Sequence, residues 1–231
     1  KKIYRSNPTI VGEHLKKVLS LLIYHFFHTF KKIFSGMNFN SVIFSIPIFF
    51  TLIILEIVYA VYKRPDYYKV ADTISNINCG IGDQVIGMMS KVVTIGIYQY
   101  LFQNFAIFHF ESNLVTFLIL FLLVDFLYYW KHRLSHEINL LWLGHSIHHQ
   151  SEEYNLSVAL RQSWFDKFFS FPFYLPLALI GFDTQTFVIA VGLNLLYQFW
   201  VHTEVIDRMG FLESFLSTPS HHRVHHARNP E

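Results

Sequence analysis

The sequence contains little of what cross-links or solubilises a small protein. Cys79 is the single cysteine among 231 residues, which excludes an internal disulfide, a cysteine-ligated zinc site and an iron–sulfur cluster within the chain. Charged residues amount to 15% and the formal net charge is +2, so the chain is not disordered and we expect no nucleic-acid partner. Strand-like alternation, internal repeats and low-complexity segments are also absent.

Apolar and aromatic residues are abundant instead: 52% of the chain is hydrophobic, with 25 Phe and 13 Tyr. A helix needs about 20 mostly apolar residues to cross a bilayer. Segments 38–62 and 112–130 meet this requirement, and segment 92–110 meets it more weakly because it carries three amide side chains. Core helices of a soluble protein would have charged outer faces, and these segments have none. The sequence therefore predicts an all-α, polytopic integral membrane protein.

Two further segments complete this architecture. The apolar runs 168–182 and 184–201 predict a hairpin that dips into the membrane, with the first run broken by Pro172 and Pro176. Segment 18–30 lies between lysine pairs and is too short to span, so we expect a helix in the membrane interface. The predicted domains are an N-terminal interfacial segment over 1–40 and a membrane domain over 41–231.

Histidine is the exceptional residue, with 14 in the chain. Three clusters follow the apolar segments, with the sequences HRLSH, HSIHH and HHRVHH. On a helix, residues i, i+3 and i+4 lie within about 100° of one another, so each cluster is expected to present its imidazoles on one face. Thr218 and Pro219 fit an N-cap and a first-turn proline, which predicts a separate helix for the third cluster. The clustered histidines are His132, His136, His145, His148, His149, His221, His222, His225 and His226.

Clustered imidazoles indicate a metal site. Neutral imidazole is a ligand for iron, zinc and copper, and eight or more histidines exceed what one four-coordinate zinc requires, so two metal ions are expected. His202, in the sequence WVHTE, is a further candidate ligand if the chain folds back towards the third cluster. Asp125 and Glu137 flank the first cluster and are candidates for a catalytic role or for orienting the ligands. We place this di-metal site at the membrane–water interface, because the clusters follow the apolar segments.

The order HxxxH, HxxHH, HxxHH after membrane segments resembles the fatty acid hydroxylase / sterol desaturase superfamily, over roughly residues 40–231. Four stretches look, within it, like the alkylglycerol monooxygenases: VDFLYYWKHRLSHEINLLWLGHSIHH (124–149), SEEYNLSVALRQS (151–163), NLLYQFWVHTEVID (194–207) and TPSHHRVHHARN (218–229). Members of the family continue beyond the third cluster, so we expect the membrane domain to be incomplete at its C-terminus.

This resemblance implies an O2-dependent lipid monooxygenase. The expected reaction is hydroxylation next to the ether bond of an alkylglycerol, which gives an aldehyde and a glycerol derivative. The implied cofactors are two iron ions, for which zinc can substitute in a purified sample, and tetrahydrobiopterin as electron donor. The implied partners are a membrane lipid and the bilayer itself, with the protein in the endoplasmic reticulum membrane of a eukaryote or the inner membrane of a bacterium.

Two alternatives remain open at this stage. A sterol or fatty-acyl hydroxylase or desaturase would use the same di-iron centre with a different substrate and donor. A histidine-based membrane metal transporter would bind zinc reversibly, although transport sites usually lie in the middle of spans. An inactive protein of the same fold is not indicated, because all three clusters are intact.

Overall fold

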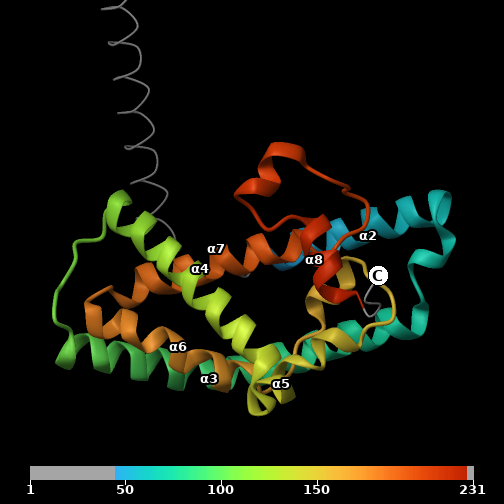
Figure 1. Cartoon of the computed structure of the whole chain (residues 1–231). Coiled ribbons are helices and arrows are strands. Elements are labelled where there is room, and N and C mark those ends of the chain that lie inside the picture. Colours follow the sequence, from blue (N-terminus) through green and yellow to red (C-terminus); the bar gives the residue numbers. More distant parts are fainter. Residues whose placement is uncertain (1–44, 228–231) are drawn as a thin grey trace, which may run out of the picture.

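The structure, a computed structural model, describes residues 45–227, and these residues form helices and connecting turns with no β-strand. The longer helices are α2 (Ser45–Lys63), α3 (Val70–Phe105), α4 (Leu114–Glu137), α6 (Asp166–Ile180) and α7 (Thr184–Trp200). Two short helices, α5 (Asn139–His145) and α8 (Pro219–His226), lie near the end of α4 (Figure 1). The all-α prediction is therefore confirmed for the described residues. The predicted interfacial helix over 18–30 lies outside them.

Short 3-10 turns connect these helices: η2 (Pro65–Tyr67), η3 (His148–Gln150), η4 (Leu156–Leu160) and η5 (Gly210–Ser214). Side-chain caps define where two of the long helices begin. Asn113 accepts a hydrogen bond from the backbone N–H of Thr116 at the start of α4, and Asp183 accepts one from Thr186 at the start of α7, both at 3.0 Å.

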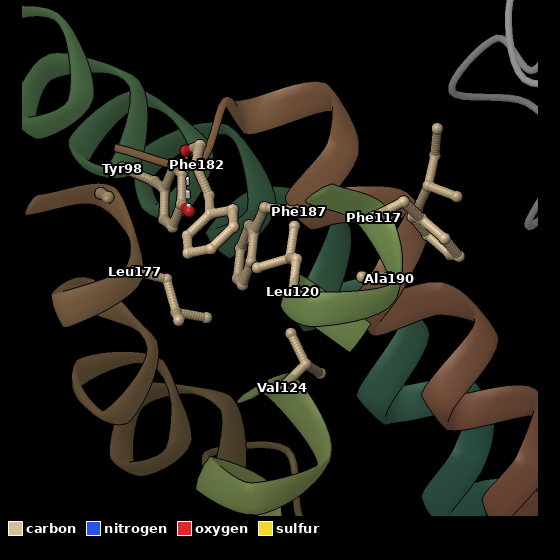
Figure 2. Close-up of a cluster of buried hydrophobic side chains, with 10 residues drawn as sticks. Tyr98, Phe117, Leu120, Val124, Leu177, Phe182, Phe187 and Ala190 are labelled. Atoms are coloured by element: carbon tan, nitrogen blue, oxygen red, sulfur yellow. Dashed lines mark hydrogen bonds between the residues drawn. The ribbon is translucent and has the colours of Figure 1, made fainter. Parts of the chain in front are cut away.

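Helices α3, α4, α6 and α7 pack together, with α6 lying along α3 and α4 crossing both α6 and α7 (Figure 1). Figure 2 shows their shared core, in which the ring of Tyr98 stacks on that of Phe187 at 4.2 Å between centroids. The hydroxyl of Tyr98 donates to the carbonyl of Phe182 at 3.1 Å, so this buried aromatic residue also ties α3 to the α6–α7 turn. Leu120 and Val124 supply the contribution of α4 and are fully buried.

The two runs of the predicted hairpin form α6 and α7, joined by Gly181–Asp183, but these helices pack against α3 and α4 rather than along each other. That the hairpin dips into the membrane stays a prediction. The prediction that prolines break its first run is wrong, because α6 continues through both Pro172 and Pro176. Each proline lacks the N–H that would donate a helical hydrogen bond. The packing of α6 against three neighbouring helices stabilises the helix despite these two missing bonds.

Two segments of the described chain are long and apolar enough to cross a membrane: Pro65–Phe105, which includes α3, and α4. Only 17% and 22% of their most apolar windows are buried inside the protein, whereas a soluble core helix would be mostly buried. Helix α3 begins 22 residues before the predicted segment 92–110. Its first half contains polar residues, so the apolar pattern of the sequence marked only its second half. Those polar groups are satisfied internally, as when Lys167 pairs with buried Asp83 at 2.8 Å.

Candidate metal centre

Four separate segments bring the histidines together. The end of α4 carries His132 and His136, and the short helix α8 carries the third cluster. The second cluster lies at the end of α5 and in the 3-10 turn η3 (His148–Gln150) that follows. His202 lies just after α7, and its ring centroid is 4.4 Å from that of His222 in α8, so the expected fold-back is present. Helix α8 begins at Pro219, directly after Thr218, as the sequence predicted.

Nine of the ten candidate ligands form two neighbouring groups. Within each group, one nitrogen from every ring lies within 4.8 Å of all the others. We call them the five-histidine group, comprising His132, His136, His145, His149 and His225, and the four-histidine group, comprising His148, His202, His222 and His226. The groups adjoin, since the rings of His149 and His226 stack at 4.2 Å between centroids.

This division differs from the expectation that each cluster forms one face. Helix α5 ends at His145, so His148 lies in a different turn and joins the other group. In α8, His222 and His226 stay together while His225 crosses to the five-histidine group. The helical angle explains this split: i+4 lies about 40° to one side of residue i and i+3 about 60° to the other, which is enough to aim at two centres.

In the four-histidine group, the Nε2 atoms of His148 and His202 face each other without a proton between them. The Nδ1–H of His202 donates to the carbonyl of Gln198 at 2.8 Å, and that of His148 donates to the carbonyl of Arg161 at 3.1 Å. A neutral imidazole carries one N–H, so both Nε2 atoms bear lone pairs, yet they lie 3.1 Å apart. Two facing lone pairs repel unless a cation lies between them. This geometry therefore fits a bound metal ion.

The rings are held in the neutral form that a metal requires. Burial, reinforced by neighbouring imidazoles, lowers the pKa of His149 to about 3 and the pKa of His202 to about 4. Burial also lowers the pKa of His148, and the nearby His202 adds to the effect. Protons therefore compete weakly with a cation at these nitrogens near neutral pH.

Nitrogen spacing supports the same conclusion in both groups. Adjacent Nε2 atoms lie 2.8 Å apart for His132 and His225, and 3.2 Å apart for His222 and His226. Two nitrogens about 2.0–2.1 Å from one metal ion are separated by roughly 2.8 to 3.4 Å, for coordination angles between 90° and the tetrahedral value. With nitrogen donors alone, the residues fit iron, zinc or copper rather than magnesium or calcium.

The two groups differ in access. A cavity of about 700 Å³ is lined by three rings of the five-histidine group, His136, His149 and His225, and by one ring of the four-histidine group, His226. His148 and His202, at the heart of the four-histidine group, are each only 4% exposed. A reactant from outside the protein can therefore approach the five-histidine group more directly.

Three sequence candidates lie outside both groups. His221 is exposed on α8 and belongs to neither. Glu137 pairs with Arg133 at 3.1 Å on an exposed face of α4. Asp125 accepts a hydrogen bond from Asn194 at 2.8 Å, and Asn194 in turn contacts Gln198, so Asp125 reaches His202 only through intermediate residues.

The sequence did not identify the groups that orient the rings. Besides the carbonyls of Gln198 and Arg161, the Tyr128 hydroxyl contacts Nδ1 of His132 at 3.1 Å. A backbone carbonyl leaves no signature in a sequence, since any residue can supply it. Tyr128 lies four residues before His132, a helical spacing that could have identified it.

The chain is similar in sequence to several known proteins. Residues 117–231 match the fatty acid hydroxylase family. An alkylglycerol monooxygenase of Danio rerio is 45% identical over 186 residues, which are 80% of this chain and 42% of that protein. The alkylglycerol monooxygenase of Homo sapiens is 42% identical over 185 residues, covering 79% and 41%. An ornithine lipid hydroxylase of Rhizobium tropici is 30% identical over 107 residues, covering 46% and 32%.

The chain thus spans about two fifths of the length of the alkylglycerol monooxygenases that it matches. No solved structure shows a significant match.

Proposed function

The chain belongs to the fatty acid hydroxylase family, and from that premise we propose that it is a membrane-bound di-iron monooxygenase acting on ether lipids. The observation that carries the proposal is the pair of all-imidazole groups, together with the unprotonated Nε2 atoms of His148 and His202 that face each other in one of them. Its likeness to two alkylglycerol monooxygenases over about 80% of its length favours an alkylglycerol as substrate.

In the proposed reaction, a C–H bond on the carbon next to the ether oxygen becomes C–OH. One oxygen atom of O2 enters the lipid and the other leaves as water, with two electrons and two protons supplied by a donor. The resulting hemiacetal breaks its C–O bond to give an aldehyde and a glycerol derivative. Tetrahydrobiopterin is the proposed donor, on the strength of the resemblance to alkylglycerol monooxygenases.

Two iron ions bound by the histidines would supply the reductive activation of O2 that side chains alone cannot perform. The protein's own contribution is to orient the nine rings. Carbonyls of Gln198 and Arg161 keep the protons of His202 and His148 on Nδ1, which leaves Nε2 free to bind. Because the imidazoles are neutral, ions held by them would keep their full positive charge and would stabilise negative charge nearby.

The exposed surface of α3 and α4 supports a membrane location and entry of the lipid from the bilayer. Outward-facing apolar side chains on α3 and α4, such as Met89, Val92 and Leu122, are 74%, 77% and 68% exposed. Such surfaces suit lipid rather than water. We propose an integral membrane location, in the endoplasmic reticulum if the organism is a eukaryote and in the inner membrane if it is a bacterium.

Turnover of an alkylglycerol tests this function. Purified protein, supplied with iron, O2 and reduced tetrahydrobiopterin, should release a long-chain aldehyde, and replacing His148 with Ala should abolish aldehyde release and lower the iron content by the ion of the four-histidine group. His221→Ala is the matched control, because His221 belongs to the third cluster but to neither group, and it should retain both. Equal loss in the two variants, or full activity of His148→Ala, would contradict the proposal.

A second candidate function is hydroxylation of a fatty-acyl or sterol carbon. The resemblance to an ornithine lipid hydroxylase over 107 residues favours it. The product separates the two: hydroxylation away from an ether oxygen leaves an intact hydroxylated lipid, whereas the ether reaction releases an aldehyde. A metal transporter is not favoured, since the named relatives at 30–45% identity are oxygenases by name.

A further inference from the structure

Arg161 connects the four-histidine group to α3, a role that no sequence pattern indicated. Its side chain is buried, at 9% exposure, just after the 3-10 turn η4 (Leu156–Leu160). The guanidinium donates from Nε to the carbonyl of Ile147 at 2.8 Å. Its other arm donates to Ser75 at 3.0 Å and to Asn76 at 2.9 Å, both on α3. Arg161 therefore ties α3 to the loop between His145 and His148.

The same residue also fixes a metal-binding ring directly. Its backbone carbonyl accepts the Nδ1–H of His148 at 3.1 Å. His148 is thus held from two sides, through the peptide that precedes it and through its imidazole. This support is needed because α5 ends at His145, so no regular helix holds His148 in place.

Guanidinium chemistry suits this task. Three acceptors from two segments are reached by one planar group, whose donors point in fixed directions. A lysine has a single charged nitrogen and cannot reach the Ile147 carbonyl and the α3 acceptors with the same geometry. Asp72, with a carboxylate oxygen 3.8 Å from the guanidinium, offsets the positive charge beside the proposed metal centre.

We propose that Arg161 is a positioning residue that sets the metal affinity of the four-histidine group and leaves that of the five-histidine group unchanged. The inference rests on the proposed function only in taking both groups as metal sites. Among the ligands, Arg161 contacts His148 and the peptide before it, whereas His145 and His149 contact each other at 3.1 Å between Nε2 atoms.

The test is anaerobic titration of the purified, metal-free protein with Fe²⁺ or Co²⁺. The wild-type protein should bind two ions. Arg161→Gln and Arg161→Lys should weaken one of the two binding steps by about 10- to 100-fold, the usual effect of removing a group that orients a ligand. The other step should keep its affinity.

Asp83→Asn is the matched control. It breaks the buried pair between Asp83 on α3 and Lys167 on α6, which lowers stability without touching a histidine. It should lower the unfolding temperature and leave both binding steps unchanged. If Asp83→Asn weakens one step as Arg161→Gln does, general destabilisation explains the result and the proposal fails.

Combined variants identify the affected group. In a His202→Ala background, which already disables the four-histidine group, Arg161→Gln should have no further effect on metal binding. In a His225→Ala background its effect should persist in full. The opposite pattern, or two unchanged steps in Arg161→Gln, would overturn this inference alone. A wild-type protein that binds no iron or cobalt would instead contradict the proposed function.

Discussion

Glu56 offers a sharp test of how the loops around the centre are held. Its carboxylate is 5% exposed and lies on the otherwise apolar helix α2. One oxygen accepts hydrogen bonds from Tyr67 at 3.1 Å and from Thr203, and the other accepts from the backbone N–H of Leu156 at 2.8 Å and from Tyr68. Thr203 follows His202, and Leu156 begins η4, the turn that leads to Arg161.

Glu56→Leu keeps the volume and removes every acceptor. The hydroxyls can rotate towards new partners, but the N–H of Leu156 is fixed by its backbone. With one or two donors left unsatisfied at about 1–3 kcal/mol each, the variant should lose about 1–6 kcal/mol of stability. For a chain of this size, that corresponds to a fall in unfolding temperature of roughly 2 to 24 °C. Glu56→Gln keeps one oxygen and should lie between the variant and the wild type.

Thermal unfolding in detergent, followed by tryptophan fluorescence, measures the effect. Glu137→Gln is the control, because its carboxylate is 55% exposed and its pair with Arg133 contributes at most about 1 kcal/mol. A Glu56→Leu protein as stable as the wild type would refute the reasoning. So would a Glu137→Gln protein that unfolds at the same lowered temperature.

Further predictions follow from the fold and the site. Gly181→Ala should destabilise the hairpin by about 2 kcal/mol or more, because Gly181 has φ +123° and a Cβ there would lie 1.9 Å from the carbonyl oxygen of Phe108; an unfolding temperature within 1 °C of wild type, roughly a few tenths of a kcal/mol, would contradict this. Tyr98→Phe should cost about 1 kcal/mol, the value of one buried hydrogen bond to the Phe182 carbonyl, and unfolding measurements that show no loss would be inconsistent with it. Glu137→Gln should retain aldehyde release, since its side chain contacts Arg133 rather than a histidine; loss of turnover with both metal ions retained would instead assign Glu137 a catalytic role.

The sequence predicted which residues form the centre better than how they divide. Imidazoles spaced at three and four residues are a local property, so the positions of the clusters and the start of α8 could be read from the chain. Their division into two groups depends on where α5 ends and on how α8 meets α4. Both are set by tertiary packing, which a helical wheel does not contain.

The sequence predicted the role of polar residues less well than the positions of the histidines. Asn76 and Asp83 lie in the first half of α3, which the sequence did not predict as part of an apolar segment, and both are buried and satisfied by Arg161 and Lys167. Those partners lie more than 80 positions along the chain, so no local pattern could reveal them. Conversely, Asp125 and Glu137 are close to the first cluster in sequence, but neither side chain contacts a histidine ring in the structure.

X-ray absorption spectroscopy at the iron edge, combined with a count of iron per chain, tests the di-metal centre most directly. For protein purified after growth with added iron, the account predicts two ions per chain and a first coordination shell of nitrogen and oxygen at about 2.1 Å, with the outer-shell pattern of imidazole. A sulfur shell at about 2.3 Å, or one ion per chain in a fully loaded sample, would contradict it.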